Sequence, residues 1–267
     1  MRRLAFLLPL LLPLAVQAAL PPADVPIERR DPNSRLAHQQ LLDKAKHGTI
    51  DLYFEGDSIT RRWDATDYPQ YLANFNKNFH GWNAADFAWG GDTTNNILWR
   101  LDHGELDNLH PKVIVLLAGT NNVGPRAGTD ADAQTVAKGI KAILDRFQQK
   151  APDATIILTA IFPRNDNLAA VPTINKINAI LATYADGKHI RFLNINDKLA
   201  DKDGHLFPGM MNRDNLHPTE KAYQLWADAL KPILTDLLGP PAQTDLAPPP
   251  TGDPSAKPKP TTPAVKP

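Results

Sequence analysis

The chain has 267 residues, 42% of them apolar and 22% charged, which is enough for one domain with a core of ordinary size. Its 29 basic and 29 acidic residues balance, so a nucleic-acid polyanion is not the expected partner. The absence of cysteine excludes disulfides, thiolate metal sites, a cysteine nucleophile and a lipoprotein anchor.

The N-terminus has the pattern of a secretory signal peptide. Residues 1–18 begin with two arginines, continue with a leucine-rich stretch and end on Val-Gln-Ala, as the charged, apolar and cleavage regions of such a signal do. The apolar part is too short to span a bilayer. We therefore expect an exported protein, periplasmic or secreted, whose mature chain has no integral membrane segment. The proline-rich residues 19–33 predict an irregular segment before the domain.

Short apolar segments then alternate with stretches of helical period. Strands are predicted at 51–54, 84–88, 113–117, 155–159 and 190–195. Helices are predicted at 34–48 with Ser34 as N-cap, and at 68–79, 94–101, 131–150, 173–184 and 219–238. This alternation predicts a parallel sheet with helices on both faces, in one domain over 34–239. Residues 240–267, dominated by Pro, Thr, Ala and Lys, predict an extended, disordered tail.

Polar motifs follow the first three predicted strands. Gly-Asp-Ser at 56–58 follows the first strand, Gly-Gly-Asp-Thr at 90–93 the second and Gly-Thr-Asn-Asn at 119–122 the third. Ligands bind beyond the carboxyl ends of the strands in an open parallel sheet. We therefore expect the three motifs to converge on one site.

A serine, a histidine and an aspartate supply the parts of a nucleophilic site. A serine hydroxyl is a poor nucleophile until a base takes its proton, and the base needs a third group to orient it. Ser58 is the predicted nucleophile, His217 the base and Asp214 the orienting acid. Pro218 suits the first turn of the last helix, which places the acid and the base in the loop before it.

Acyl transfer also needs donors aimed at the oxygen that becomes negative. Gly91 lacks a side chain, so a substrate oxygen can approach its N–H closely. The Asn121 amide and the Ser58 backbone N–H are the other predicted oxyanion donors. The histidines show no metal-ligand spacing, so we expect neither a metal nor a cofactor.

Three further residues near these motifs have competing interpretations. Trp89 is the tryptophan best placed to touch substrate, although tryptophan more often lies partly buried in the core. Arg164 is a candidate for pairing with an anionic substrate, or else a donor that fixes its loop. Asp92 is expected to cap the helix that begins near residue 93.

These residues together resemble the SGNH, or GDSL-like, hydrolase superfamily. Ser58, Gly91, Asn121 and His217 fall in the order of its four blocks, and Asp214 matches its triad acid. The resemblance covers about 31–238. At residues 89–94, 98–101, 104–106 and 111–115 the sequence looks like the branch that contains the platelet-activating-factor acetylhydrolase catalytic subunits. It implies a three-layer α/β/α flavodoxin-like fold with about five parallel strands, and metal-free hydrolysis of short acyl esters.

The first block departs from the family pattern, because isoleucine stands where the family name has leucine. Residues 56–60 also lack the second glycine of the nucleophile elbow of α/β-hydrolases, which argues against that rival fold.

The sequence thus predicts an exported serine esterase that releases a short acyl group, with acetyl and a carbohydrate ester as the preferred substrate. One alternative is a lipid or thioester hydrolase of lysophospholipase or arylesterase type, which requires an apolar channel leading from Ser58. The other is a non-catalytic glycan-binding module, which would tolerate loss of the triad.

Overall fold

The computed structural model describes residues 22–124 and 128–254, so the predicted signal peptide at 1–18 lies outside the described residues. The strands are β1 (Leu52–Gly56), β2 (Ala84–Asp86), β3 (Val113–Leu117), β4 (Thr155–Thr159) and β5 (Ile190–Leu193). The helices are α1 (Pro32–Lys44), α2 (Ser58–Arg61), α3 (Pro69–Phe79), α4 (Thr94–Asp102), α5 (Asp130–Lys150), the 3-10 helix η1 (Leu168–Ala170), α6 (Val171–Ala182), α7 (Asn196–Leu199) and α8 (Glu220–Leu238). Within the described residues, no helix combines the length and the apolar character needed to cross a membrane.

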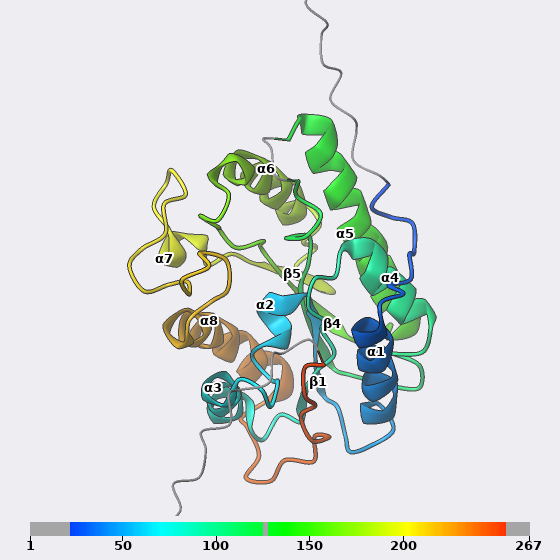
Figure 1. Cartoon of the computed structure of the whole chain (residues 1–267). Helices are drawn as coiled ribbons and strands as arrows, with labels where there is room; N and C mark the ends of the chain where they lie inside the picture. The colour runs from blue at the N-terminus through cyan, green and yellow to red at the C-terminus, as the bar shows by residue number, and fades with distance from the viewer. Residues whose placement is uncertain (1–21, 125–127, 255–267) are drawn as a thin grey trace, which may run out of the picture.

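The strands form one parallel sheet in the order β2-β1-β3-β4-β5 (Figure 1). This is the doubly wound, flavodoxin-like order, and its direction reverses between β1 and β3. Gly56 at the end of β1 pairs with Leu117 at the end of β3, so the chain leaves both strands at the same point. The predicted fold class of five parallel strands between helical layers is confirmed.

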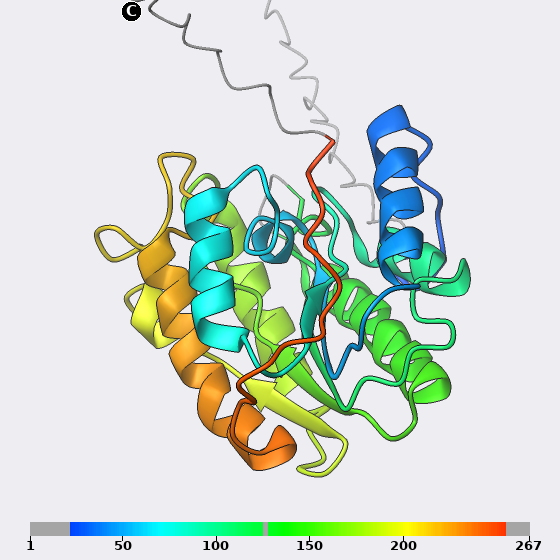
Figure 2. The same cartoon turned by 90° about the horizontal axis from the view of Figure 1, so that it is seen from below.

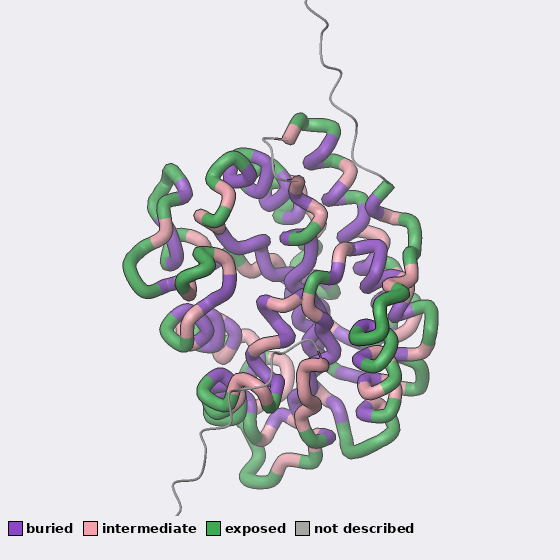
Figure 3. Tube along the Cα trace, in the orientation of Figure 1, coloured by how far each residue is buried: buried purple, intermediate pink, exposed green. Residues whose placement is uncertain are grey.

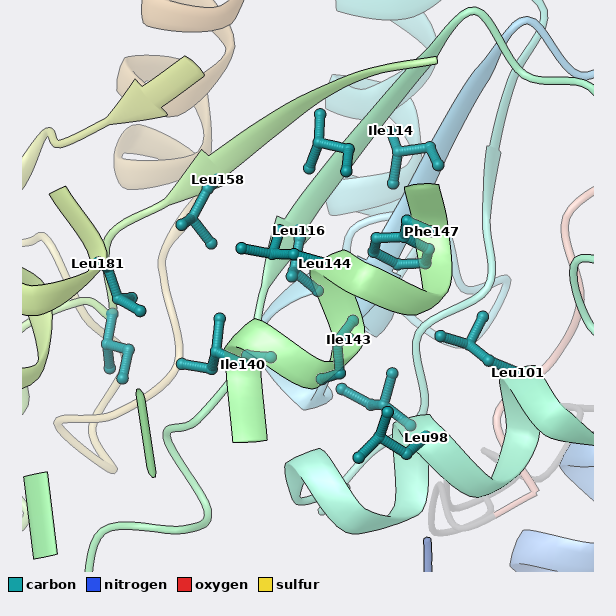
Figure 4. Packing of buried hydrophobic residues seen from close by; sticks show 14 of the residues in the cluster. Leu98, Leu101, Ile114, Leu116, Ile140, Ile143, Leu144, Phe147, Leu158 and Leu181 are labelled. Carbon is teal, nitrogen blue, oxygen red and sulfur yellow. The ribbon is translucent and has the colours of Figure 1, made fainter. Parts of the chain in front are cut away.

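Apolar side chains cover both faces of the sheet, as parallel strands require. On one face Ile114 and Leu116 of β3 join a cluster with Phe147 of α5 (Figure 4). On the other face Val115 joins a cluster with Trp226 of α8. Alternate residues of β3 therefore enter different layers, and the buried segments lie at the centre of the molecule (Figure 3).

The first helix begins before its predicted cap. Asp31 is the N-cap, and its carboxylate accepts the Ser34 N–H at 2.9 Å, while Pro32 occupies the first turn. Ser34 lies inside the helix and accepts the Trp89 indole N–H at 2.9 Å. The prediction of Ser34 as N-cap is wrong, because an aspartate followed by proline supplies the same cap three residues earlier.

Residues 22–31, the described part of the predicted irregular segment 19–33 that precedes α1, contain no helix or strand and are held against α4. The Asn95 side chain donates to the carbonyls of Pro22 and Val25 at 2.8 and 2.7 Å. The Thr94 hydroxyl donates to the Ala23 carbonyl at 2.7 Å. Packing therefore begins upstream of residue 34, where the sequence placed the domain boundary.

The predicted disorder of the tail is wrong for residues 240–254, which lie extended across the molecule (red in Figure 2). The Thr49 N–H donates to the Leu246 carbonyl at 2.8 Å, and the Ala242 N–H donates to the Gly81 carbonyl at 2.9 Å. A Cβ at Gly81 would collide with the Ala242 carbonyl. Backbone groups rather than large apolar side chains hold this segment, so its composition did not reveal the packing. Residues 255–267 lie outside the described residues.

Candidate active site

A tight turn between β1 and α2 places Ser58. The strand ends at Gly56, Asp57 caps α2 by accepting the Ile59 N–H at 2.9 Å, and Ser58 is the first helical residue. A Cβ at Gly56 would lie 2.5 Å from the Thr60 hydroxyl oxygen, so the turn requires glycine. Burial raises the pKa of Asp57 to about 7. Asp57 is therefore a structural cap beneath the serine.

The loop before α8 brings a histidine and an aspartate to this serine. The Nε2 atom of His217 lies 2.8 Å from Ser58 Oγ, and its Nδ1 atom lies 2.7 Å from Asp214 Oδ2. The other carboxylate oxygen of Asp214 accepts the backbone N–H groups of Leu216 and His217 at 3.1 and 3.0 Å. The structure thus brings the three predicted residues into hydrogen-bonding contact, in the order that a nucleophile, base and orienting acid require.

Two contacts hold this loop in place. The Asn212 side chain donates to the His217 carbonyl at 3.0 Å. The Tyr223 hydroxyl of α8 donates to the Ile59 carbonyl of α2 at 2.7 Å. The helix after the histidine is therefore tied directly to the short helix that carries the serine.

The two ionisable groups have lowered pKa values for different reasons. Burial favours neutral Asp214, but hydrogen bonds from His217 and Leu216 outweigh it and lower its pKa to about 2. Burial and the positive charge of Arg62 lower the pKa of His217, against the opposing effect of Asp214. The arrangement therefore favours an ionised aspartate beside a neutral histidine at neutral pH, which is the form in which Nε2 accepts a proton.

Arg62 is a site residue that the sequence analysis missed. Its guanidinium lies 3.6 Å from Asp214 Oδ2 and stands over the Tyr68 ring, 5.3 Å from the ring centroid. The only available signal was its position four residues after Ser58, on the next turn of a helix that was itself not predicted.

Two of the predicted oxyanion donors, Gly91 and Asn121, are linked to the glycine motif that approaches the serine. Gly91 has φ +81° and no hydrogen-bond acceptor among the described residues takes its N–H. Gly90 approaches the serine so closely that a Cβ there would be 3.7 Å from Ser58 Cβ. One Asn121 amide hydrogen is donated to the Asp92 carbonyl at 2.9 Å, which leaves the second for a substrate oxygen. Gly91 and Asn121 are both exposed, so a substrate can reach them.

The two candidate substrate contacts have other partners. Trp89 is 2% exposed, and its indole N–H is donated to Ser34 beneath α1. Arg164 pairs with Asp166 at 2.5 Å and donates to the Thr120 carbonyl at 3.1 Å. These contacts favour a core role for Trp89. They favour for Arg164 the alternative that it fixes the loop that carries Asn121.

Asp92 does not cap α4, contrary to the prediction. Thr93 is the N-cap, in a reciprocal capping box with Asn96. The Asp92 carboxylate instead accepts from Arg100 at 2.7 Å and from Arg29 at 3.2 Å. The aspartate is free for these ion pairs because threonine supplies the cap.

Arg100 is the centre of a buried charge cluster, which we define as Arg100 with Glu55, Asp92 and Glu105. Its guanidinium lies 2.7 Å from Glu55 and 2.7 Å from Asp92, and it also contacts Glu105. All four residues are at most 4% exposed. Burial raises the pKa of Glu55 to about 8, against the lowering effect of Arg100. The cluster joins the end of β1 to the glycine motif after β2.

One group in the described part of the chain has the geometry for a cation. The ligand atoms of Asp201, Asp203 and His205 lie within 4.8 Å of one another on the surface. The Asp201 carboxylate already accepts the backbone N–H groups of the other two residues, both at 2.9 Å. This loop geometry accounts for the cluster, and the expectation that activity needs no metal stays a prediction.

The model of the GDSL-like lipase/acylhydrolase family matches residues 54–225, which include Ser58 and His217. The chain belongs to this family. It is 32% identical over 203 residues to the platelet-activating factor acetylhydrolase IB subunit alpha2 of Gallus gallus, covering 75% of this chain and 83% of the relative. It is 29% identical to subunit alpha1 of Bos taurus, over 75% of this chain and 82% of that one.

The fold of this GDSL-like hydrolase is shared with a solved GDSL-like lipase from Bacteroides thetaiotaomicron. The TM-score is 0.60 at 21% sequence identity, covering 78% of this chain and 98% of the other. Membership of the family makes this GDSL-like hydrolase a carboxylic ester hydrolase, with a small-molecule ester as substrate. The matched range leaves out Arg29 and residues 240–254, although both contact the elements that carry the site.

Proposed function

We propose that this hydrolase cleaves short-chain acyl esters, O-acetyl esters above all, through an acyl-enzyme formed on Ser58. The observation that carries the proposal is the 2.8 Å contact between His217 Nε2 and Ser58 Oγ, continued by the 2.7 Å contact between His217 Nδ1 and Asp214. A base that is hydrogen-bonded to the nucleophile and oriented by a carboxylate is the arrangement that activates a serine.

In the first half of the reaction, Ser58 Oγ attacks the ester carbonyl carbon and its proton moves to His217 Nε2. The carbonyl oxygen becomes negative and is held by the Ser58 and Gly91 backbone N–H groups and by the free Asn121 amide hydrogen. Collapse of this intermediate breaks the bond to the alcohol, which leaves with the proton from His217. The acyl group remains on Ser58.

In the second half, water attacks the acyl carbon while His217 takes one of its protons. The second tetrahedral intermediate uses the same three donors. It collapses to the free carboxylic acid, and the proton on His217 returns to Ser58 Oγ. Asp214 stays ionised throughout, in keeping with its pKa of about 2, and stabilises the imidazolium in each half.

The preference for acetyl esters is supported by the curated relatives, which are named acetylhydrolases. For the alcohol we propose a carbohydrate, because an exported enzyme meets O-acetylated polysaccharide outside the cytoplasm. Export itself is part of the proposal and is supported by the signal-like pattern of residues 1–18. Recovery from the periplasm or the medium of a chain that begins at Ala19 would support it, whereas an intact N-terminus in the cytoplasm would refute it.

The substrate class is tested with p-nitrophenyl esters from acetyl to palmitoyl and with acetate release from acetylated xylan. We expect Ser58-dependent turnover that falls steeply beyond short acyl groups, and release of acetate from the polymer. A preference for long chains would replace the proposal with the lipid or thioester hydrolase. Absence of turnover on every ester would leave the glycan-binding module as the better account.

A further inference from the structure

The segment before α1 places Arg29 against the glycine motif after β2, beside the proposed oxyanion donor Gly91. Arg29 lies outside the range matched by the family, and its guanidinium is partly exposed. The Nη1 atom donates to the Gly90 carbonyl and, at 3.2 Å, to the Asp92 carboxylate. The Nη2 atom pairs with Asp31 at 3.3 Å. Arg29 therefore binds both Gly90 and Asp92, the residues before and after Gly91.

The contact with Gly90 fixes the direction of the Gly91 N–H. The Gly90 carbonyl and the Gly91 N–H belong to one planar peptide group, and in a trans peptide these two bonds point in opposite directions. An arginine that holds the carbonyl on one side therefore turns the N–H to the other. Gly91 has φ +81°, a conformation that glycine enters and leaves easily. The Asp92 N–H closes this turn on the Trp89 carbonyl at 3.2 Å, but the Gly90–Gly91 peptide at its centre takes no part in that bond, so the contact with Arg29 helps to hold this peptide in one orientation.

The same contact makes the N–H a stronger donor. A cationic donor on a carbonyl oxygen polarises its amide, and hydrogen bonds linked through one peptide group strengthen each other. No acceptor among the described residues takes the Gly91 N–H, so this polarisation is available to a substrate oxygen. The gain is greatest when that oxygen carries negative charge, which occurs only in the tetrahedral intermediates.

Arg29 also supports the side-chain donor. The Asp92 carbonyl accepts the Asn121 amide at 2.9 Å, while the Asp92 carboxylate is the ion-pair partner of Arg29. Arg29 therefore contacts the peptide that carries the Gly91 donor. Together with Arg100 it also contacts the Asp92 carboxylate, and the Asp92 carbonyl orients the Asn121 donor.

We propose that Arg29 is a positioning residue of the oxyanion hole, which holds and polarises the Gly90–Gly91 peptide and, together with Arg100, holds Asp92, whose carbonyl accepts the Asn121 amide. This inference rests on the proposed serine esterase function. It assigns to a segment upstream of the family's matched range a direct effect on the chemical step rather than on substrate affinity.

The test compares Arg29→Ala and Arg29→Lys with the matched control Arg30→Ala, using the acetyl ester and measuring kcat, KM and melting temperature. Arg30 is the neighbouring residue, with its side chain 80% exposed and paired only with Glu28 among the described residues. Loss of a whole oxyanion donor costs about 10²–10³ in kcat in other enzymes. We expect Arg29→Ala to lower kcat by roughly tenfold to a hundredfold, with KM within about twofold of wild type, because the donor remains but is no longer held.

Lysine keeps the positive charge of Arg29 but lacks the planar, several-donor guanidinium, so Arg29→Lys should recover part of the lost kcat. This variant also tests the proposal if Arg29→Ala does not fold. Added ethylguanidinium at a non-denaturing concentration should raise kcat of Arg29→Ala and leave Arg30→Ala unchanged. A purely structural role predicts a lower melting temperature with no such rescue.

Ser58→Ala, measured in parallel, separates the two claims. If Ser58→Ala is inactive while Arg29→Ala keeps wild-type kcat, or loses activity only through KM, the inference about Arg29 is wrong and the proposed function stands. If Ser58→Ala retains turnover, the proposed function itself is wrong.

Discussion

Arg100 and Asp214 are both paired with ionisable neighbours close to the same site, but the fold buries the first and leaves the second accessible. The Arg100 side chain is 5% exposed and is surrounded by three carboxylates. The Asp214 side chain is 44% exposed and pairs with one histidine and, more distantly, with Arg62. Burial fixes the first group of charges as part of the framework, because separating them would leave a charge in a dry interior.

Solvent reaches the Asp214 carboxylate, although the His217 side chain beside it is only 10% exposed. Charge pairing alone therefore does not identify a reactive group in this molecule. In the proposed mechanism, the reactive charge differs from the framework charges because it is exposed and because it is linked to Ser58 through the 2.8 Å contact of His217.

The largest loss of activity should come from removing Ser58, the serine that contacts His217. Ser58→Ala removes the nucleophile without touching the buried cluster, so kcat should fall by at least about 10³-fold. The melting temperature should stay within a few degrees of wild type, because Ser58 is a small, half-buried residue. Steady-state kinetics on the acetyl ester and a thermal melt check both parts. A large loss of stability would place Ser58 among the framework residues instead.

The largest effect on stability should come from the buried cluster. Arg100→Met keeps the volume but removes the cation shared by Glu55, Asp92 and Glu105, of which Asp92 keeps Arg29 as a partner. Breaking a buried ion pair in this way typically costs about 3–5 kcal/mol in the free energy of unfolding. The matched control is Lys141→Met, whose partner Asp145 lies one turn away on α5 with both side chains about half exposed. That pair should contribute about 0–1 kcal/mol. Urea unfolding of the two variants measures the difference, and equal effects would contradict the distinction drawn here.

The extended tail offers an intermediate case, in which backbone carbonyls and a hydroxyl accept hydrogen bonds from a buried cation of the serine helix. Arg61 of α2 is 1% exposed and donates to the hydroxyl and carbonyl of Thr251 and to the carbonyl of Gly252. A chain that ends at Gly239 loses these acceptors, and hydrogen bonds to a charged group contribute about 1.5–3 kcal/mol each. We expect a loss of at least about 2 kcal/mol in the free energy of unfolding. A chain that ends at Pro254 keeps the contacts and should unfold like the full chain.

The smallest effect should be a shift in the pH dependence of the accessible pair. His217 must be neutral to accept the Ser58 proton, and its pKa is lowered from 6.5 by burial and by Arg62. The acid limb of kcat/KM should therefore have its midpoint below 6.5. Removing the positive charge in Arg62→Gln favours protonated His217, so the midpoint should move to higher pH. A midpoint unchanged or moved to lower pH in this variant would show that Arg62 does not act on the histidine.

The sequence predicted the fold well where the physical signal was local and continuous. The buried strands β3 and β4 were predicted with their observed bounds, because apolar runs bounded by turn residues leave few alternatives. The short helices were missed, since a single turn such as α2 contains too few residues to show a helical period. The helix cap at Asp31 was misplaced by three residues because several neighbouring residues are competent caps.

The contact among Ser58, Asp214 and His217 was predictable from the sequence, whereas the residues around them were not. Ser58, Asp214 and His217 have residue types that few roles explain in combination, and the structure places them in contact. Arg29 and Arg62 are ordinary surface-type residues by sequence, and their positions depend on how distant segments pack. The prediction for the tail at 240–254 was wrong for a related reason, because its contacts are hydrogen bonds of backbone and polar side-chain groups, which composition does not encode.

Labelling with a fluorophosphonate, which reacts preferentially with an activated serine, followed by peptide mass spectrometry, tests whether His217 activates Ser58. We expect one equivalent of label, located on Ser58, with labelling abolished in His217→Ala although that variant stays folded. Label on another residue, or unchanged labelling of Ser58 without His217, would contradict the serine–histidine–aspartate mechanism.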